Sequence, residues 1–298
     1  LVYVSWQIYS RLPALRSRKT SRLPLLLIGN ALLVVYSIGL NLSEYRNVTW
    51  SSYFSSLRNL RNSNASLPLN ANGLKPDIYY IILDGYVRSD VLKDLYDYDN
   101  SEFVNNLEME GFFVAQQSHS NYAKTILSVP STLNMDYVDT FAPGLDDSKF
   151  WWLMEPFIDH SEVRTLLKSQ GYQTVSFSTN WSLTDMNSAD IHLAAFPVEL
   201  TDFEQYLLQT TPLRLSQPFL QDSASVFTSE TQRRTILHTL GALDDFVSDP
   251  DPVFVFAHIL LPHPPFVLDA EGKPVQSATD FSFKDAEDFE GSSEEYRK

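Results

Sequence analysis

Three short stretches of the sequence carry side chains that could do chemistry together. Asp84 closes an apolar run, Thr125 and Ser128 stand where a helix is expected to begin, and His258 and His263 follow a second apolar run. A carboxylate, a hydroxyl and an imidazole are the groups that metal binding, nucleophilic attack and proton transfer require. The question is which structural elements would bring them to one place.

Asp84 follows the run Ile78 to Leu83, which is β-branched and aromatic and begins just after a proline. This pattern is typical of a buried strand. Open α/β sheets bind ligands at the carboxyl ends of their strands, and Gly85 would let the chain turn sharply there. Asp84 is therefore a candidate metal ligand or general base. The alternative is that it caps a helix starting near Ser89.

The second stretch, residues 125–132, has the sequence TILSVPST. It places several hydroxyl side chains where a helix is expected to begin. A hydroxyl in this position can cap the helix, and Ser128 or Ser131 would suit that role. The same position suits a nucleophile, because the helix dipole and the free N–H groups stabilise an anion such as a phosphate or sulfate. A neighbouring metal would lower the pKa of the hydroxyl further.

The third stretch, residues 258–266, reads HILLPHPPF and follows an apolar run. Its two histidines would again lie at the carboxyl end of a strand. His263, between prolines, is the better candidate for contacting an anion or protonating a leaving group. A histidine in a proline-rich turn can also be purely structural. The other histidines have no comparable context and are expected on the surface or in the core: His119, His160, His192 and His238.

The elements expected to position these residues alternate along the chain. Strands are predicted at 78–83, 112–115, 173–178 and 253–258, and helices at 89–95, 101–110, 127–135, 160–170 and 228–247. Residues 179–226 give no clear pattern. Alternating strands and helices predict an α/β fold with a mainly parallel central sheet and helices on both faces.

Residues 23–43 are predicted to form a transmembrane helix. The stretch from Leu23 to Leu42 carries no charge and is long enough to span a bilayer of about 30 Å. A buried core helix is the alternative. Residues 1–22 would be the end of a membrane segment followed by a basic cytoplasmic loop. The chain after the transmembrane helix is therefore expected to be extracytoplasmic. Residues 44–75 would be an amphipathic helix near 50–60 followed by a linker, and 76–298 the folded domain.

The charge distribution excludes one class of partner. The chain has a formal net charge of −15, and all 37 of its acidic residues lie from Glu44 onward, with 17 of its 22 basic ones. Residues 44–298 thus carry a net charge of −20. Such a surface argues against nucleic acid as a partner, because phosphate backbones need cationic faces. There is no cysteine, and hence no disulfide framework or thiol nucleophile.

Taken in order, these motifs resemble the sulfatase/alkaline-phosphatase superfamily over residues 76 to 270. The likeness rests on a strand ending in Asp84-Gly85, on Thr125-x-x-Ser128-Val-Pro130, and on a strand leading to His258 and the Pro-His263-x-Pro turn. With the upstream membrane span, it narrows to the membrane-anchored branch that includes lipoteichoic-acid synthases and phosphoethanolamine transferases. The resemblance implies an alkaline-phosphatase-like fold.

The resemblance also implies roles for these residues. Thr125 would be the nucleophile, and Asp84 and Thr125 would share a divalent metal such as Zn, Mn, Mg or Ca. His263, and with it His258, would contact the substrate. That substrate would be a lipid- or glycan-linked phosphate or sulfate ester, and the enzyme would reside in the cell membrane with its catalytic domain extracytoplasmic.

Two departures from the family pattern limit this inference. Sulfatases that use formylglycine need an arginine two residues after the proline, and Thr132 stands there. The family's later Asp-His metal-ligand pair has no match, so we expect the C-terminal part of the domain beyond Lys298 and the fragment itself to be inactive. The alternatives are a formylglycine-type sulfuric ester hydrolase that modifies Ser128, a catalytically degenerate membrane scaffold of the same fold, and a sensor ectodomain.

Overall fold

The computed structural model describes residues 32, 50–62, 75–145, 151–211, 215–220, 223–226, 228–246, 251–264 and 266–275. The predicted transmembrane helix over residues 23–43 lies, except for Leu32, outside these ranges, as do residues 1–22. Among the helices that are described, none is long and apolar enough to cross a membrane.

The centre of the fold is a parallel sheet of β1 (Ile78–Leu83), β2 (Gln173–Phe177), β3 (Ile191–Leu193) and β4 (Val253–Ile259). The strand order is β1-β4-β2-β3, and every neighbouring pair is parallel. The prediction of an α/β fold with a parallel sheet is confirmed. Parallel alignment brings all the carboxyl ends of the strands to one end of the sheet.

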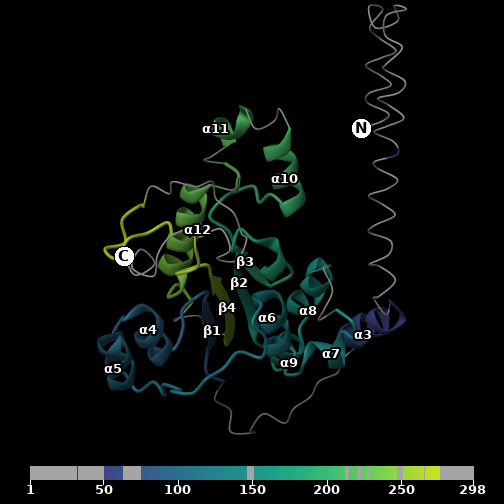
Figure 1. The fold of residues 1–298 in the computed structure, drawn as a ribbon. Helices are drawn as coiled ribbons and strands as arrows, with labels where there is room; N and C mark the ends of the chain where they lie inside the picture. Colours follow the sequence, from purple (N-terminus) through teal and green to yellow (C-terminus); the bar gives the residue numbers. More distant parts are fainter. Residues whose placement is uncertain are drawn as a thin grey trace, which may run out of the picture.

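The helices of the described ranges lie on both faces of this sheet and beyond its ends (Figure 1). They are α3 (Trp50–Asn62), α4 (Ser89–Tyr96), α5 (Ser101–Met109), α6 (Thr125–Leu133), α7 (Val138–Phe141), α8 (Glu155–Asp159), α9 (Glu162–Ser169), α10 (Asp202–Thr210), α11 (Gln217–Leu220) and α12 (Ser229–Ala242), with the 3-10 turns η3 (Trp151–Met154) and η4 (Ser182–Thr184). In Figure 1, α10 and α11 lie beyond one end of the sheet, and α3 lies beside α7 and α8.

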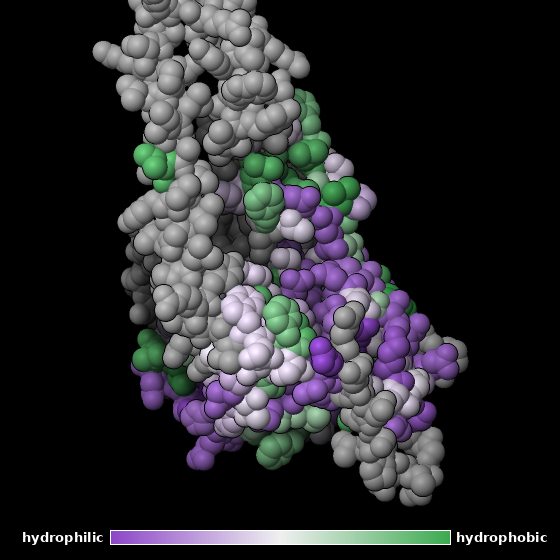
Figure 2. Space-filling model, turned by 90° about the vertical axis from the view of Figure 1, so that its right-hand side faces the viewer, coloured by the Kyte–Doolittle hydropathy of each residue, from purple (hydrophilic) through white to green (hydrophobic). Residues whose placement is uncertain are grey.

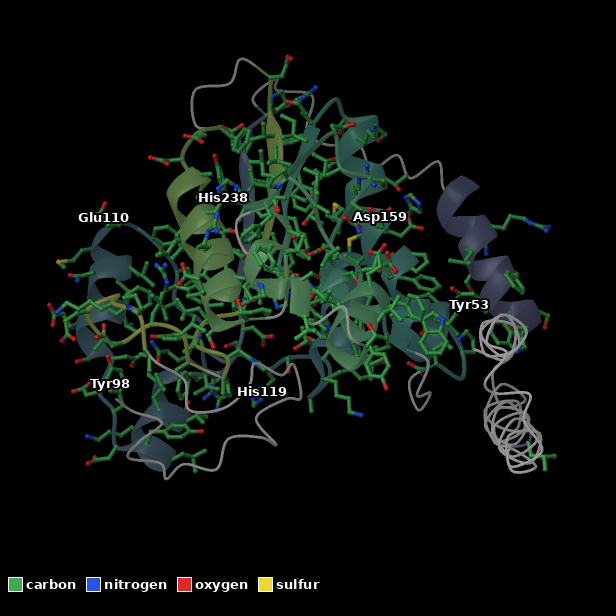
Figure 3. All side chains as sticks on the ribbon, turned by 90° about the horizontal axis from the view of Figure 1, so that it is seen from above. Tyr53, Tyr98, Glu110, His119, Asp159 and His238 are labelled. Carbon is green, nitrogen blue, oxygen red and sulfur yellow. The ribbon has the colours of Figure 1, made fainter. Side chains whose placement is uncertain are left out.

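Both faces of the sheet are covered, as the alternation of side chains along β4 shows. Val255 and Ala257 point toward a cluster that includes Ile236 of α12, whereas Phe254 and Phe256 point toward a cluster with α6, α8 and α9. All seven residues of β4 are buried, as expected of a strand covered on two sides. Figure 3 shows the same arrangement, with His238 of α12 and Asp159 of α8 on opposite sides.

The predicted strand at 112–115 is wrong. Gly111, with φ +89°, ends α5, and the N–H of Phe112 donates to the carbonyl oxygen of Leu107 at 3.0 Å. The chain then runs as an irregular segment, and Phe113 is 93% exposed. Its apolar residues resemble a strand in sequence, but they do not pair with any strand of the described chain.

Candidate active site

Asp84 and Thr125 meet at the carboxyl end of the sheet. Asp84 follows the last residue of β1, and its N–H donates to the carbonyl oxygen of Ile259 at the end of β4, at 2.9 Å. Thr125 is the first residue of α6, and its Oγ1 lies 3.5 Å from both carboxylate oxygens of Asp84. The sequence separates the two residues by about forty positions, and the fold brings together the pair that we expected to share a metal.

The loop that carries His263 packs directly against the turn after Asp84. Gly85 has φ +84°, and a Cβ added to it would lie 3.3 Å from the backbone nitrogen of His263. His263 is partly buried, and its Nδ1 lies 2.6 Å from the carbonyl oxygen of Pro264. A carbonyl oxygen can only accept, so Nδ1 carries a proton and Nε2 is the nitrogen that can exchange one.

His258 lies underneath Asp84 rather than at the surface. It is only 2% exposed, and its Nε2 lies 3.3 Å from Oδ2 of Asp84 without the geometry of a hydrogen bond. Its Nδ1 lies 2.9 Å from Oγ1 of Thr184. His258 therefore contacts Asp84 from the interior of the domain and adjoins the site through that carboxylate. We expected it on the substrate side, and in this arrangement it contacts the carboxylate instead.

The carboxyl of Asp84 is held in its ionised form. Burial pushes its pKa upward, but the neighbouring His258, His263 and Thr125 outweigh this effect, and the pKa is lowered overall. An ionised carboxylate beside a hydroxyl and a buried imidazole is a cation-binding arrangement. It is also a poor general base, because it binds a proton weakly.

The N-terminus of α6 is not capped by a side chain. Lys124 occupies the capping position and makes no side-chain hydrogen bond to the helix. Ser131, by contrast, is buried and structural, since its Oγ donates to the carbonyl oxygen of Asp136 at 2.6 Å and accepts from Asn121 at 2.9 Å. An uncapped helix start presents its first N–H groups to an anion, which suits a transferred phosphate or sulfate group.

Arg88 braces the segment after Asp84 to the segment before Thr125. Its guanidinium pairs with Asp90 at 2.8 Å and donates from Nη1 to the carbonyl oxygen of Ser118 at 2.9 Å, with His119 at 3.1 Å. Between these segments and α5 lies a cavity of about 350 Å³ with a largely apolar lining. Among its lining residues are Tyr86, Phe103, Leu107, Phe112 and Val114.

Two polar residues near the carboxyl end of β2, Asn180 and His192, were not identified from the sequence as candidate site residues. Asn180 has φ +64°, is buried, and neither polar atom of its side-chain amide finds a hydrogen-bond partner in the described chain. His192 lies in β3 between Ser176, at 2.8 Å, and Glu199, at 3.0 Å. β3 has only three residues, and residues 179–226 gave no pattern from which to place it.

The Nε2 atom of His258 is buried and has no hydrogen-bond partner in the described chain. Because Nδ1 faces Thr184, Nε2 is the ring nitrogen that faces the Asp84 carboxylate, 3.3 Å from Oδ2. The 3.5 Å from Thr125 Oγ1 to each carboxylate oxygen is also longer than an ordinary hydroxyl–carboxylate hydrogen bond. Asp84, Thr125 and His258 thus offer two oxygens and a nitrogen to a divalent metal. Within the described ranges, no group of three or more His, Cys, Asp or Glu side chains is arranged to hold one.

The comparisons with known proteins provide no relative with which these residues could be compared. Comparison of the chain with protein-family models, with curated proteins and with solved structures gives no match. The assignment of a function therefore depends on the geometry of the Asp84–Thr125 site and on the sequence resemblance.

Proposed function

We propose that this chain is a membrane-anchored, extracytoplasmic, metal-dependent enzyme of the sulfatase/alkaline-phosphatase type. It transfers or hydrolyses a phospho- or sulfo-ester group through Thr125. The observation that carries the proposal is the position of Thr125 Oγ1, at the uncapped start of α6 and 3.5 Å from both oxygens of an ionised carboxylate.

The residues fit a two-step transfer. Oγ1 of Thr125 forms a bond to the phosphorus or sulfur of the ester, and its proton passes to solvent. The bond to the leaving alcohol breaks as that oxygen takes a proton from His263 through Nε2. Water or an acceptor hydroxyl then displaces Thr125 and gives its own proton to Nε2 of His263, while Oγ1 of Thr125 regains a proton from solvent. The free N–H groups of α6 stabilise the charge on the transferred group in both steps.

A divalent cation would be held by Asp84, Thr125 and Nε2 of His258. When bound, it would lower the pKa of the threonine hydroxyl and stabilise the charge that develops on the transferred group. Thr184 would orient the histidine from its other ring nitrogen, as is usual for metal-bound imidazoles. Zn, Mn, Mg and Ca remain the metals that we propose for this site.

The apolar cavity beside the site suits the non-reacting part of the substrate. Its aromatic lining lies between the segments that lead from Asp84 and into Thr125. This placement favours an ester linked to an apolar group, and so a lipid-linked phosphate or sulfate over a glycan-linked one.

Mass spectrometry of the nucleophile tests the proposal. The full chain would be expressed in membranes with Mn²⁺ or Zn²⁺, quenched in acid and cleaved with trypsin, which releases residues 125–149 between Lys124 and Lys149. We expect an adduct on Thr125 whose mass identifies the group, and none in Thr125→Ala. An adduct or an oxidised residue at Ser128 would instead indicate a formylglycine-type sulfatase. An unmodified peptide from metal-loaded protein given substrate would favour the degenerate scaffold.

A further inference from the structure

An apolar tip is formed by the exposed faces of α10 and α11. On α10, Phe203, Tyr206 and Leu207 follow helical spacing and all face solvent, with Phe203 72% exposed. On the segment that leads into α11, Leu215 is 74% exposed, and Phe219 of α11 is 85% exposed. Figure 2 shows hydrophobic side chains in the upper part of the coloured surface, at the height of these two helices. We call Phe203, Tyr206, Leu207, Leu215 and Phe219 the apolar tip.

The apolar tip is attached to the rest of the domain by buried side chains and hydrogen bonds. The opposite face of α10 is buried through Gln205 and Leu208, and the amide of Gln205 donates to the carbonyl oxygen of Ser225. A bridge between Val198 and Ala224 closes the base of the segment. Thr201 and Glu204 form a capping box at the start of the helix. A helix held this well on one face exposes its apolar stripe as part of the folded structure.

The tip also lies at the same end of the sheet as the candidate active site. The segment that holds α10 and α11 connects the carboxyl end of β3 to the start of α12. Asp84 and Thr125 lie at the carboxyl ends of the strands as well, so the tip and the site share one end of the molecule. Figure 1 shows α10 and α11 rising from that end.

We infer that the apolar tip inserts into the surface of the bilayer to which the chain is anchored. Phenylalanine, tyrosine and leucine are side chains that partition into the membrane interface. The chain from residue 44 onward carries 37 acidic against 17 basic residues, and this charge opposes association with a second copy of the same chain. A domain that is anchored to a bilayer and has an acidic surface can bind that bilayer by inserting apolar side chains. The apolar tip supplies such side chains.

The chain length keeps the start of α3 close to the proposed membrane anchor. The uncharged stretch ends at Leu42, eight residues before Trp50 begins α3. Eight residues span at most about 29 Å when fully extended. Tyr53 of α3 is buried against the domain, with its hydroxyl donating to the carbonyl oxygen of Leu153 at 3.2 Å. The inference rests on the proposed membrane anchor but uses none of the proposed chemistry.

Site-specific labelling tests the inference, and the absence of native cysteine makes each label unique. Phe219→Cys would be labelled with an environment-sensitive fluorophore in the full chain, reconstituted in phosphatidylcholine vesicles. We expect quenching by lipids that carry a spin label in the acyl chain. Ser169→Cys, at the exposed end of α9 and at the opposite end of the sheet, is the matched control and should respond only to an aqueous quencher such as iodide.

A second variant separates the tip from the fold. In a Leu215→Cys chain, the added substitutions Phe203→Ser and Phe219→Ser remove two exposed rings and should reduce the lipid quenching at least threefold. Equal lipid quenching with and without the two rings would overturn the inference. So would a label at 219 that is as accessible to iodide as the control, or one shielded from both quenchers, which would indicate a protein contact. Failure of the control protein to float with vesicles would contradict the anchor itself.

Discussion

At the scale of single residues, Gly85 is a point where the two loops of the candidate site pack closely against each other. Its φ of +84° already disfavours any side chain, and a Cβ would lie 3.3 Å from the backbone nitrogen of His263. Gly85→Ala should therefore destabilise the domain by about 2 kcal/mol and lower the activity by moving His263. Thermal unfolding of the purified chain measures the first effect and ester turnover the second.

Gly111→Ala is the matched control, because Gly111 has φ +89° and nothing lies within 4 Å of an added Cβ. It should cost only the backbone strain, about 1 kcal/mol, and leave turnover unchanged. Equal losses of stability and activity in the two variants would refute a functional contact between Gly85 and the His263 loop.

Asp185 is a second residue with a measurable signature. Burial raises its pKa from 3.8 to about 7, against hydrogen bonds from the N–H and hydroxyl of Thr179 and with Glu199 nearby. Because the folded state holds this proton more tightly than the unfolded state, the stabilisation is complete below pH 3.8 and is lost as the pH rises through 7. A hydrogen bond to Glu199 raises the pKa of His192 above its ordinary value of 6.5. The folding stability that His192 contributes is therefore also lost as the pH rises above 6.5.

The melting temperature should therefore fall between pH 5 and pH 7.5. Asp185→Asn keeps an acceptor for the Thr179 N–H and removes the titration, so its melting temperature should vary less with pH. At pH 7.5 it should exceed that of the parent chain by roughly 3 °C. Asp84 and Glu199, whose pKa values are lowered, lose stabilisation only at more acidic pH and do not affect this window. Parallel pH curves for the two proteins would contradict the assignment.

At the scale of elements, α3 is attached to the domain chiefly through Tyr53. That side chain is 5% exposed, and its ring lies 6.0 Å from that of Phe157 (Figure 3). Tyr53→Ala should cost about 3 kcal/mol, and Tyr53→Phe, which loses only the hydroxyl, about 1 kcal/mol. Phe54→Ala, one position along and 59% exposed, should cost under about 0.5 kcal/mol. Proteolysis of α3 should accelerate in the same order.

The elements that the sequence could predict are those with strong local patterns. β1 and β4 are apolar runs beside turn residues, β2 follows a helix that ends at a glycine, and α12 begins close to where its spacing indicates. β3 and α10 were not predictable, because β3 has three residues and α10 turns apolar side chains outward. The strand predicted at 112–115 was wrong for a related reason, since a local apolar pattern does not provide a neighbouring strand.

The candidate site was predictable in its residues but not in its geometry. The sequence places Asp84, Thr125 and His263 after strands or at a helix start, and parallel strands bring such positions together. The sequence does not indicate that His258 would be buried beneath Asp84, nor that Asn180 would take a positive φ. Both depend on how β2 and β4 pack as neighbours.

At the scale of the whole molecule, a bound metal should stabilise the fold. Addition of Zn²⁺ or Mn²⁺ at about one hundred times its dissociation constant should add about 2.7 kcal/mol to the free energy of unfolding. Asp84→Asn should abolish this gain. Asp90→Asn, which removes an exposed carboxylate paired with Arg88, should retain it. Equal metal-induced shifts in Asp84→Asn and in the parent chain would show that the cation binds elsewhere.

The position of β4 has a consequence for how the protein is made. β4 separates β1 from β2 in the sheet, and its Val253 bonds to Asp77 across 176 positions of sequence. Until residue 259 has been synthesised, β1 and β2 have no strand between them, and the chain from Ile78 to Pro252 emerges with the place between these two strands unfilled. Contacts this distant in sequence form slowly and leave apolar strands exposed meanwhile. We propose that this domain is exported, and the late pairing of β4 would keep the nascent chain unfolded until that strand fills the place between β1 and β2.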